Sequence, residues 1–210
     1  MIARLILLLI ISSVSLADGS GPARSALEVF TDDLETFQAS FTQTVRSQDG
    51  RVQDLTTGSI WLRTPDRLRW VYEGDFPETI VADGSNVWIH DESLQQVTVK
   101  PQSDQAADSP LLILADISQL DEQFRVTELG NIEGMVLLEL KSMDAESEFE
   151  RILLGFKDAG VSMMVMEDAF GQRTEIQFDQ ALRNQAIDPV LFQFEPPADA
   201  DVVGEPVPTG

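Results

Sequence analysis

The sequence predicts a mainly β protein with few helices, in which a single curved antiparallel sheet of about eleven strands forms an incomplete β-barrel covered by lid helices. Apolar residues fall at every second position in short stretches along most of the chain, and Gly, Asn and Asp turn signals separate these stretches. Only two segments have helical spacing, and no repeat of roughly 20 to 50 residues is visible. A single layer of so many strands curls, so it has a concave face that two helices could cover.

The N-terminal segment, MIARLILLLIISSVSLA, has the pattern of a secretory signal peptide. Arg4 precedes an apolar run from Leu5 to Ile11, and the small residues Ser15 and Ala17 frame a cleavage site after Ala17. The alternative is a membrane-spanning helix, but the run is shorter than the roughly 20 residues that a bilayer core requires. We therefore expect a signal peptide at 1–17, one domain at 18–198 and an extended tail at 199–210.

The chain contains no cysteine, so disulfides and thiol chemistry are excluded. A bacterial lipoprotein needs a cysteine directly after its cleavage site to carry its acyl groups, so we expect the exported chain to be soluble rather than lipid-anchored.

The first helix is predicted by apolar residues at helical spacing. Pro22 is suited to its first turn, and one stripe follows from Ala23 through Leu27 and Phe30 to Leu34. The alternation of Phe37 to Val45 then predicts the first strand.

A meander of short antiparallel strands is predicted from Gly58 to Lys100. It contains all three tryptophans, Trp61, Trp70 and Trp88, so we expect one wall of the sheet to present large apolar side chains.

The second helix is predicted in SPLLILADISQL, where Ser109 can cap and Pro110 can start it. It is apolar on almost all sides, so it either fills the core or covers an apolar opening. Five further strands and a short turn at Asp188-Pro189 follow. The strands are Phe124 to Leu129, Met135 to Lys141, Phe149 to Lys157, Val161 to Asp168 and Arg173 to Leu182.

The net charge of −22 opposes binding to nucleic acids and to anionic membranes, and it favours basic protein partners. The alternative is a solvated acidic surface without a docking role.

Enzyme chemistry finds little support in the residues. The single histidine, His90, has no GxSxG serine for a triad, and its simplest interpretation is an exposed side chain. His/Cys ligand sets and EF-hand spacing are absent, so we expect no metal and no cofactor. A carboxylate pair of the glycosidase type stays open, although no pair stands out among 36 acidic residues.

The remaining possibility is that the protein binds an apolar ligand. A pocket could be lined by Phe41, Leu68, Trp70, Ile80, Leu111, Leu114 and the adaptable side chains of Met163, Met164 and Met166. The alternative for each single residue is an ordinary place in a filled core.

The chain resembles LolA, the periplasmic outer-membrane lipoprotein carrier family. The resemblance covers nearly all of the mature chain in several ordered motifs. These are FQASFTQTV, GSIWLRTPDRLRW, TIVADGSNVWIHD, LQQVTVKP, SPLLIL, DAFGQRTEIQF and FQFEPP.

The resemblance implies an unclosed barrel with lid helices over an apolar cavity that holds the acyl chains of a lipoprotein. LolA-like proteins take cargo from an inner-membrane lipoprotein-releasing ABC transporter complex and pass it to the outer-membrane acceptor LolB. LolB is itself a lipoprotein, so the missing cysteine indicates the shuttle, which we expect to be a monomer in the periplasm of a Gram-negative bacterium.

Candidate residues for the acyl cavity and lid combine this resemblance with the apolar pattern. They are Leu27, Phe30, Phe41, Leu68, Trp70, Ile80, Trp88, Leu111, Leu112 and Leu114. The family's basic residue before the meander proline is thought to tie the lid to the barrel. Here that position is Thr64, so Thr64 and the neighbouring Arg63 are the candidates for a lid latch. The competing function is a periplasmic adaptor or assembly factor that binds proteins through its acidic surface and its aromatic wall.

Overall fold

The computed structural model describes residues 21–104, 117, 120–144, 147, 149–158 and 160–208. The expected signal peptide and the expected lid segment with Leu111, Leu112 and Leu114 lie outside these ranges. None of the helices within them is long and apolar enough to cross a membrane.

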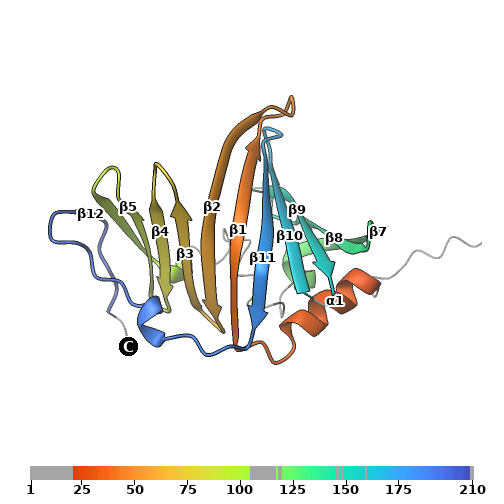
Figure 1. Ribbon diagram of the computed structural model, residues 1–210, viewed down its shortest axis with the longest axis horizontal. Coiled ribbons are helices and arrows are strands. Elements are labelled where there is room, and N and C mark those ends of the chain that lie inside the picture. Colours follow the sequence, from red (N-terminus) through yellow and green to blue (C-terminus); the bar gives the residue numbers. More distant parts are fainter. Residues whose placement is uncertain are drawn as a thin grey trace, which may run out of the picture.

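The described residues form one sheet of twelve strands in the order β12-β6-β5-β4-β3-β2-β1-β11-β10-β9-β8-β7 (Figure 1). The strands are β1 (Thr36–Arg46), β2 (Val52–Arg63), β3 (Arg67–Glu73), β4 (Glu78–Asp83), β5 (Asn86–Asp91), β6 (Gln96–Pro101), β7 (Phe124–Ile132), β8 (Met135–Ser142), β9 (Phe149–Lys157), β10 (Gly160–Asp168), β11 (Arg173–Arg183) and β12 (Asp201–Val203). The predicted fold class, an open, curved and mainly antiparallel sheet with few helices, is confirmed.

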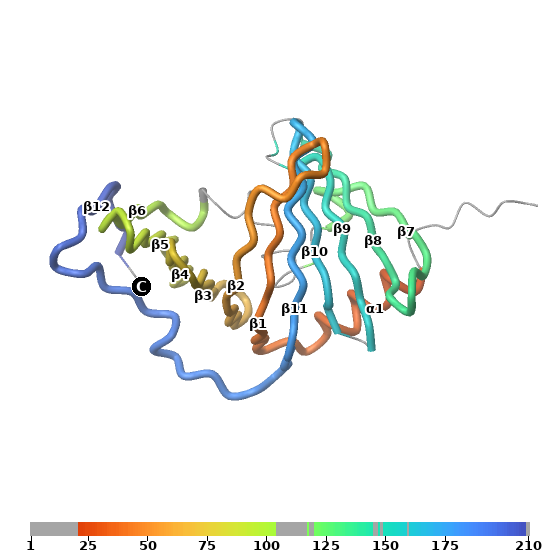
Figure 2. Tube along the Cα trace, turned by 45° about the horizontal axis from the view of Figure 1, so that its top comes forward, coloured from red at the N-terminus to blue at the C-terminus, as the bar shows by residue number. Residues whose placement is uncertain are grey.

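Most neighbouring strands follow each other in sequence as hairpins. The exception at the centre is the antiparallel pairing of β1 with β11, which joins the N-terminal and C-terminal series of strands. The sheet curls around its long central strands, as Figure 2 shows, and its two ends remain apart. It is therefore an incomplete barrel with β12 and β7 as its edges.

Helix α1 (Pro22–Thr31) packs on the inner face of the curl, where it contacts β7 to β10. The ring of Phe30 lies 5.4 Å from that of Phe37 on β1 and 6.5 Å from that of Phe156 on β9, measured between centroids. Together with Leu27, these residues belong to one large apolar cluster on the inner face. The stripe that predicted the helix is thus the surface that it buries, although Leu34 lies beyond its end.

The N-terminus of α1 is held by polar contacts to the β7 edge. The Glu128 carboxylate accepts hydrogen bonds from the backbone N–H groups of Ala23 (3.1 Å) and Arg24 (2.7 Å), which have no partner within the helix. The Arg24 guanidinium donates to both carboxylate oxygens of Asp121, at 2.7 and 2.6 Å. Asp121 lies in the short helix α2 (Leu120–Gln123). These contacts fix the position of α1 along β7.

The C-terminal segment covers part of the outer face of the sheet. The 3-10 helix η3 (Pro189–Phe192) contacts β3 and β4, and Arg69 donates to the carbonyl of Leu191 at 3.3 Å. Beyond it, Phe194 packs on an outer cluster of Val81, Trp88, Val97 and Val99. The segment then pairs in parallel with β6 as β12, which is the strand beyond the predicted eleven. The expected extended tail therefore lies along an edge of the sheet (Figure 2).

The turn between β4 and β5 is organised by the Asp83 carboxylate. It accepts hydrogen bonds from the backbone N–H groups of Ser85 and Asn86 and from the Trp88 indole, each at 2.8 Å. The Asn86 side chain in turn makes two hydrogen bonds with the backbone of Val207. Burial opposes ionisation of Asp83, but these hydrogen bonds outweigh it and lower its pKa. One carboxylate thus links the turn, the outer cluster and the C-terminal segment.

We expect Asp83→Ala to destabilise the protein by about 2–4 kcal/mol, because a buried indole N–H and two turn amides lose their acceptor. Urea unfolding of wild type, Asp83→Ala and Asp83→Asn measures this, and the Asn variant should lose less because its amide oxygen still accepts. Since the folded-state pKa of Asp83 is lowered, its contribution is present above the unfolded pKa of about 3.9 and is lost as the pH falls through the folded value. Equal stability of all three proteins at pH 7 would show that the carboxylate does not hold this turn.

Candidate functional site

The inner face of β1 to β5 is ordered in rows that run across the strands. Because the strands pair without a slip in this region, residues at every second position form continuous lines of neighbours. The deep row is Phe37, Leu62, Leu68, Ala82 and Val87. The middle row is Ala39, Ile60, Trp70, Ile80 and Ile89. Both rows are entirely apolar.

The next row, which we call the mouth row, changes from apolar to acidic. It is Phe41, Gly58, Tyr72, Glu78 and Asp91. Beyond it on β1 and β2 come the polar side chains of Gln43 and Thr56, which are paired neighbours. The inner face therefore has a sharp boundary between an apolar surface and a polar, acidic one at the same height on adjacent strands.

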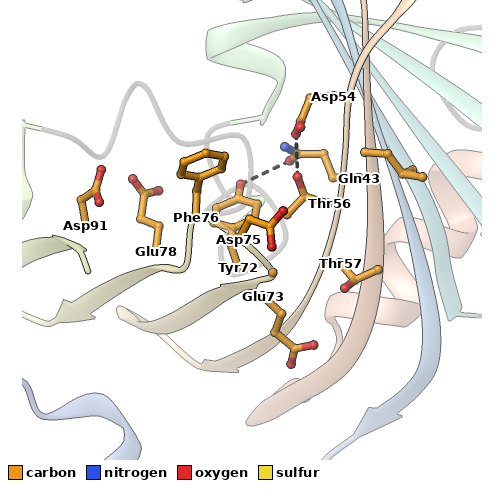
Figure 3. A pocket seen from close by; sticks show the side chains of 12 residues that line it. Gln43, Asp54, Thr56, Thr57, Tyr72, Glu73, Asp75, Phe76, Glu78 and Asp91 are labelled. Atoms are coloured by element: carbon orange, nitrogen blue, oxygen red, sulfur yellow. Dashed lines mark hydrogen bonds between the residues drawn. The ribbon is translucent and has the colours of Figure 1, made fainter. Parts of the chain in front are cut away.

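A cavity of about 730 Å³ opens at this boundary (Figure 3). Among the described residues, five carboxylates and no basic side chain line it, and the exposed ring of Phe76 stands at its edge. Figure 3 shows the carboxylates of Glu78 and Asp91 pointing to the same side, next to Phe76. The lining residues are Gln43, Asp54, Leu55, Thr56, Thr57, Tyr72, Glu73, Gly74, Asp75, Phe76, Glu78 and Asp91.

The pKa values of two side chains in the cavity, Tyr72 and Glu78, are shifted by their surroundings. Burial, with a further contribution from the Glu78 charge, raises the pKa of Tyr72 to about 12. Its hydroxyl therefore stays protonated at neutral pH and donates a hydrogen bond to Gln43 Oε1 at 3.2 Å. Burial and the neighbouring charge of Asp91 raise the pKa of Glu78. Burial is the main cause of both shifts, and a neighbouring carboxylate adds to each of them.

Aromatic rings connect the mouth row with the middle row. The rings of Phe41 and Trp70 lie 4.3 Å apart, and Tyr72 approaches Phe41 edge-on at 5.5 Å. Gly58 makes this arrangement possible, since a Cβ at position 58 would meet the carbonyl oxygen of Val71 and the Phe41 ring. This glycine is needed for close approach and not for an unusual backbone angle.

Most of the predicted cavity residues meet on the inner face. Leu27, Phe30, Phe41, Leu68 and Trp70 are buried in the same cluster, and Ile80 packs against it. Met164 and Met166 also belong to this cluster, whereas Met163 does not. The apolar rows are covered in this conformation, because the side chains of Leu68 and Trp70 are almost inaccessible to solvent. Leu111, Leu112 and Leu114 are outside the described residues.

The prediction for Trp88 is wrong, and so is that of a single tryptophan wall. Trp88 pairs with Val81, which alternates with Ile80, so its ring lies on the outer face in the cluster with Phe194. Trp61 likewise alternates with Ile60 and Leu62, which belong to the inner cluster, so only Trp70 of the three tryptophans faces inward. The length of the turn after Asp83 sets which β5 residues face inward, and this parity was not visible in the sequence.

The two latch candidates lie at the opposite end of the strands from the cavity. The hydroxyl of Thr64 donates to the carbonyl of Leu34 at 2.6 Å, and its backbone N–H donates to Glu35, so Thr64 ties β2 to the connection after α1. Arg63 is exposed and pairs with Arg67 across the hairpin. Any contact of either residue with the lid stays a prediction, because the lid segment lies outside the described residues.

The arrangement supports binding of an amphipathic molecule. The ring of His90 lies 5.8 Å from that of Phe194 between centroids and is tilted to it by 54°, away from the cavity. Within the described ranges no three His, Cys, Asp or Glu residues gather as a metal site. The apolar rows suit a hydrocarbon chain, and the cavity at their end suits its polar end.

Sequence reasoning missed the polar residues of the mouth row. Glu78, Asp91 and Gln43 were not among the candidate site residues. The sequence nevertheless contains a signal for them, because each of these polar residues is two positions away from an apolar residue that faces inward. Asp91 follows Ile89, Glu78 precedes Ile80 and Gln43 follows Phe41. Aligning the hairpins in register would have brought them together.

Comparison with known proteins places the chain in a family. Residues 32–195 match the model of the "Outer membrane lipoprotein carrier protein LolA". The chain is 38% identical over 179 residues to the outer-membrane lipoprotein carrier protein of Dechloromonas aromatica, which covers 85% of this chain and 86% of that protein. It is 33% identical over 198 residues to the protein of the same name from Nitrosospira multiformis, with 94% of both chains covered.

Solved structures support the fold. An uncharacterized conserved protein from Thermus thermophilus aligns with a TM-score of 0.55 at 16% identity, over 87% of this chain and 99% of that one. A MucB structure aligns with a TM-score of 0.51 at 19% identity, over 88% of this chain and 66% of that one. With an open curved sheet, an apolar inner face and this extent of sequence identity, the chain belongs to the outer membrane lipoprotein carrier (LolA) family.

Proposed function

We propose that this protein is a periplasmic carrier that shields the acyl chains of lipoproteins on the inner face of its sheet. In this role it takes the lipoprotein from an ATP-driven release complex in the inner membrane and passes it to an acceptor in the outer membrane. Membership of the lipoprotein carrier family supports the cargo class. The observation that carries the proposal is the pair of continuous apolar rows ending in a polar cavity.

The physical need for such a carrier follows from the cargo. Moving a CH₂ group out of water is worth about 0.8 kcal/mol, so a chain of about 16 carbons gains on the order of 12 kcal/mol by leaving water. A lipoprotein therefore does not cross an aqueous space unaided. The carrier must recover much of this free energy, but it must not recover all of it, or the cargo would never leave.

The covered inner face meets this requirement in a two-state mechanism. In the conformation described here, the apolar rows are buried and α1 contributes Leu27 and Phe30 to the inner cluster. In the loaded state, acyl chains replace part of these contacts. The contacts given up offset part of the gain from binding the chains, so cargo can pass onward without nucleotide acting on this protein.

Of the two features that favoured the alternative function of a protein-binding adaptor, the aromatic wall is not present in the described sheet. This function required an aromatic wall for protein binding, but Trp61 and Trp88 lie on the face opposite to Trp70, and Trp88 is covered by Phe194. An acidic surface alone does not select this function.

We expect Leu68→Glu to weaken binding of an environment-sensitive fluorescent fatty-acyl probe at least about tenfold, because it places a charge in the deep row. Leu182→Glu is the matched control, since Leu182 is exposed on β11. Fluorescence titration measures both, and circular dichroism checks the fold. If Leu68→Glu does not fold, Ile80→Gln tests the same surface at a less buried position. Wild-type affinity in a folded inner-face variant would contradict the proposed binding surface.

We expect Asp121→Asn to speed loading of the same probe about two- to fivefold, because it weakens the bidentate contact with Arg24 that holds α1. The factor corresponds to the roughly 0.5–1 kcal/mol that a largely exposed ion pair contributes. Stopped-flow fluorescence measures the rate, with Glu122→Gln as the neighbouring control. The Arg24 hydrogen bond lowers the pKa of Asp121, so the contact is lost only as the pH falls below the usual aspartate range. An unchanged loading rate would show that displacement of α1 does not limit loading.

A further inference from the structure

The cavity at the end of the apolar rows contains more polar chemistry than shielding a hydrocarbon requires. Three features lie at or beside it: the boundary in the mouth row, the unpartnered indole N–H of Trp70 next to Tyr72, and a lining that, among the described residues, is acidic without a basic residue. We propose that this cavity is a head-group subsite, which accepts acyl chains attached through uncharged ester or amide groups and excludes lipids with an anionic head. This inference rests on the proposed carrier function.

The boundary fixes where the polar end of a bound lipid lies. A polar group placed against the deep or middle row would lose its hydrogen bonds to water and find only apolar neighbours, which is unfavourable. The polar side chains of Tyr72 and Glu78 stand at the next height, and Gln43 follows one row further along β1. A chain lying on Leu68 and Trp70 therefore leaves its first polar atoms beside Tyr72.

The donors at this position suit a neutral carbonyl group. The Trp70 side chain is 1% exposed, and its indole N–H makes no hydrogen bond within the described part of the chain. The Trp70 and Tyr72 rings lie 5.9 Å apart between centroids, so this donor belongs to a ring that adjoins the mouth row. A buried donor without an acceptor is unfavourable, and an ester or amide oxygen of a ligand would satisfy it. The amide NH₂ of Gln43, whose oxygen already accepts a hydrogen bond from Tyr72, can provide a further donor.

The charges at this position disfavour an anionic head. The carboxylates that line the cavity are Asp54, Glu73, Asp75, Glu78 and Asp91, and no Lys or Arg of the described part of the chain lines it. Like charges at distances below a Debye length of about 10 Å at 0.1 M salt repel each other with little screening, particularly where burial lowers the local dielectric. Both phospholipids and lipoproteins carry acyl esters on a glycerol, but the remaining glycerol position bears an anionic phosphate in a phospholipid and the uncharged thioether sulfur of cysteine in a lipoprotein. A carrier loaded at a bilayer meets far more phospholipid than cargo, so this difference is a usable basis for selection.

Two fluorescent probes with the same acyl chain test the proposal: a neutral monoacylglycerol and an anionic lysophosphatidylglycerol, both below their micelle concentrations. We expect wild type to bind the neutral probe at least about fivefold more tightly, and we expect this ratio to shrink at about 1 M salt, where the Debye length is about 3 Å. In Glu78→Gln/Asp91→Asn the ratio should fall below about twofold, mainly because the anionic probe binds better. Asp91→Asn keeps an acceptor for the turn hydrogen bond from Leu94.

The matched control is Glu150→Gln/Asp158→Asn, which changes the net charge equally at exposed positions that do not line the cavity and should keep the wild-type ratio. Lowering the pH should also reduce the ratio, because Glu78, with its raised pKa, takes up a proton before ordinary carboxylates do. Trp70→Phe keeps a ring but removes the N–H, so it should weaken neutral-probe binding about threefold.

The outcomes separate this proposal from the carrier function. Equal affinity of wild type for both probes, or an unchanged ratio in Glu78→Gln/Asp91→Asn, would overturn the head-group subsite while acyl binding itself persists. If the ratio of neutral-probe to anionic-probe affinity falls equally in the control variant, net charge causes the effect, and this outcome would also overturn the head-group subsite. Failure of both probes to bind wild type would contradict the proposed carrier function directly.

Discussion

The structure depends on one constraint, which is the register of the hairpins in the β1 to β5 half of the sheet. Side chains alternate between faces, so a slip of one residue on any strand would exchange its inner and outer sets. The register places Trp70 beside Ile60 and Ile80 and brings Tyr72 beside Glu78. The same register puts Val81 and Trp88 on the outer face, where the C-terminal segment covers them. The apolar rows, the acidic cavity and the outer cluster therefore all follow from the register of these strands.

The two faces are covered in different ways, and the difference suits a carrier. On the outer face, the C-terminal segment is fixed by Phe194 packing, by the two hydrogen bonds of Asn86 with Val207 and by the pairing of β12 with β6. On the inner face, α1 is held by the part-buried hydrogen bonds to Glu128, by the exposed contact between Arg24 and Asp121 and by apolar side chains. Burial of a side chain such as Leu27 or Phe30 is worth about 1.5–3 kcal/mol, which is small beside the gain from sheltering an acyl chain. Cargo can thus replace the inner cover without disturbing the outer one.

The sequence predicted the strongly periodic parts of the fold and missed what depends on contacts between distant segments. The strands and α1 were found because period-two and period-3.6 patterns are local properties. The extra strand β12 was not, since Asp201–Val203 has no alternation and is a strand only through its pairing with β6. Trp88 was assigned to the wrong face because the length of the turn after Asp83 determines which residues of β5 face inward. The acidic cavity escaped notice because its residues come from several strands and each resembles ordinary turn or surface chemistry.

The polarity of the inner face also determines the orientation of the cargo. The apolar rows end at the cavity, and the cavity opens to solvent beside the exposed ring of Phe76. A lipoprotein bound with its acyl chains on the rows therefore extends its protein part from this end. Its attachment to the acyl groups passes the carboxylates of the mouth row, which an uncharged linkage tolerates and a phosphate does not. The arrangement that shelters the hydrocarbon thus also decides which polar groups can follow it into the cavity, so shielding and selection arise from the same rows of residues.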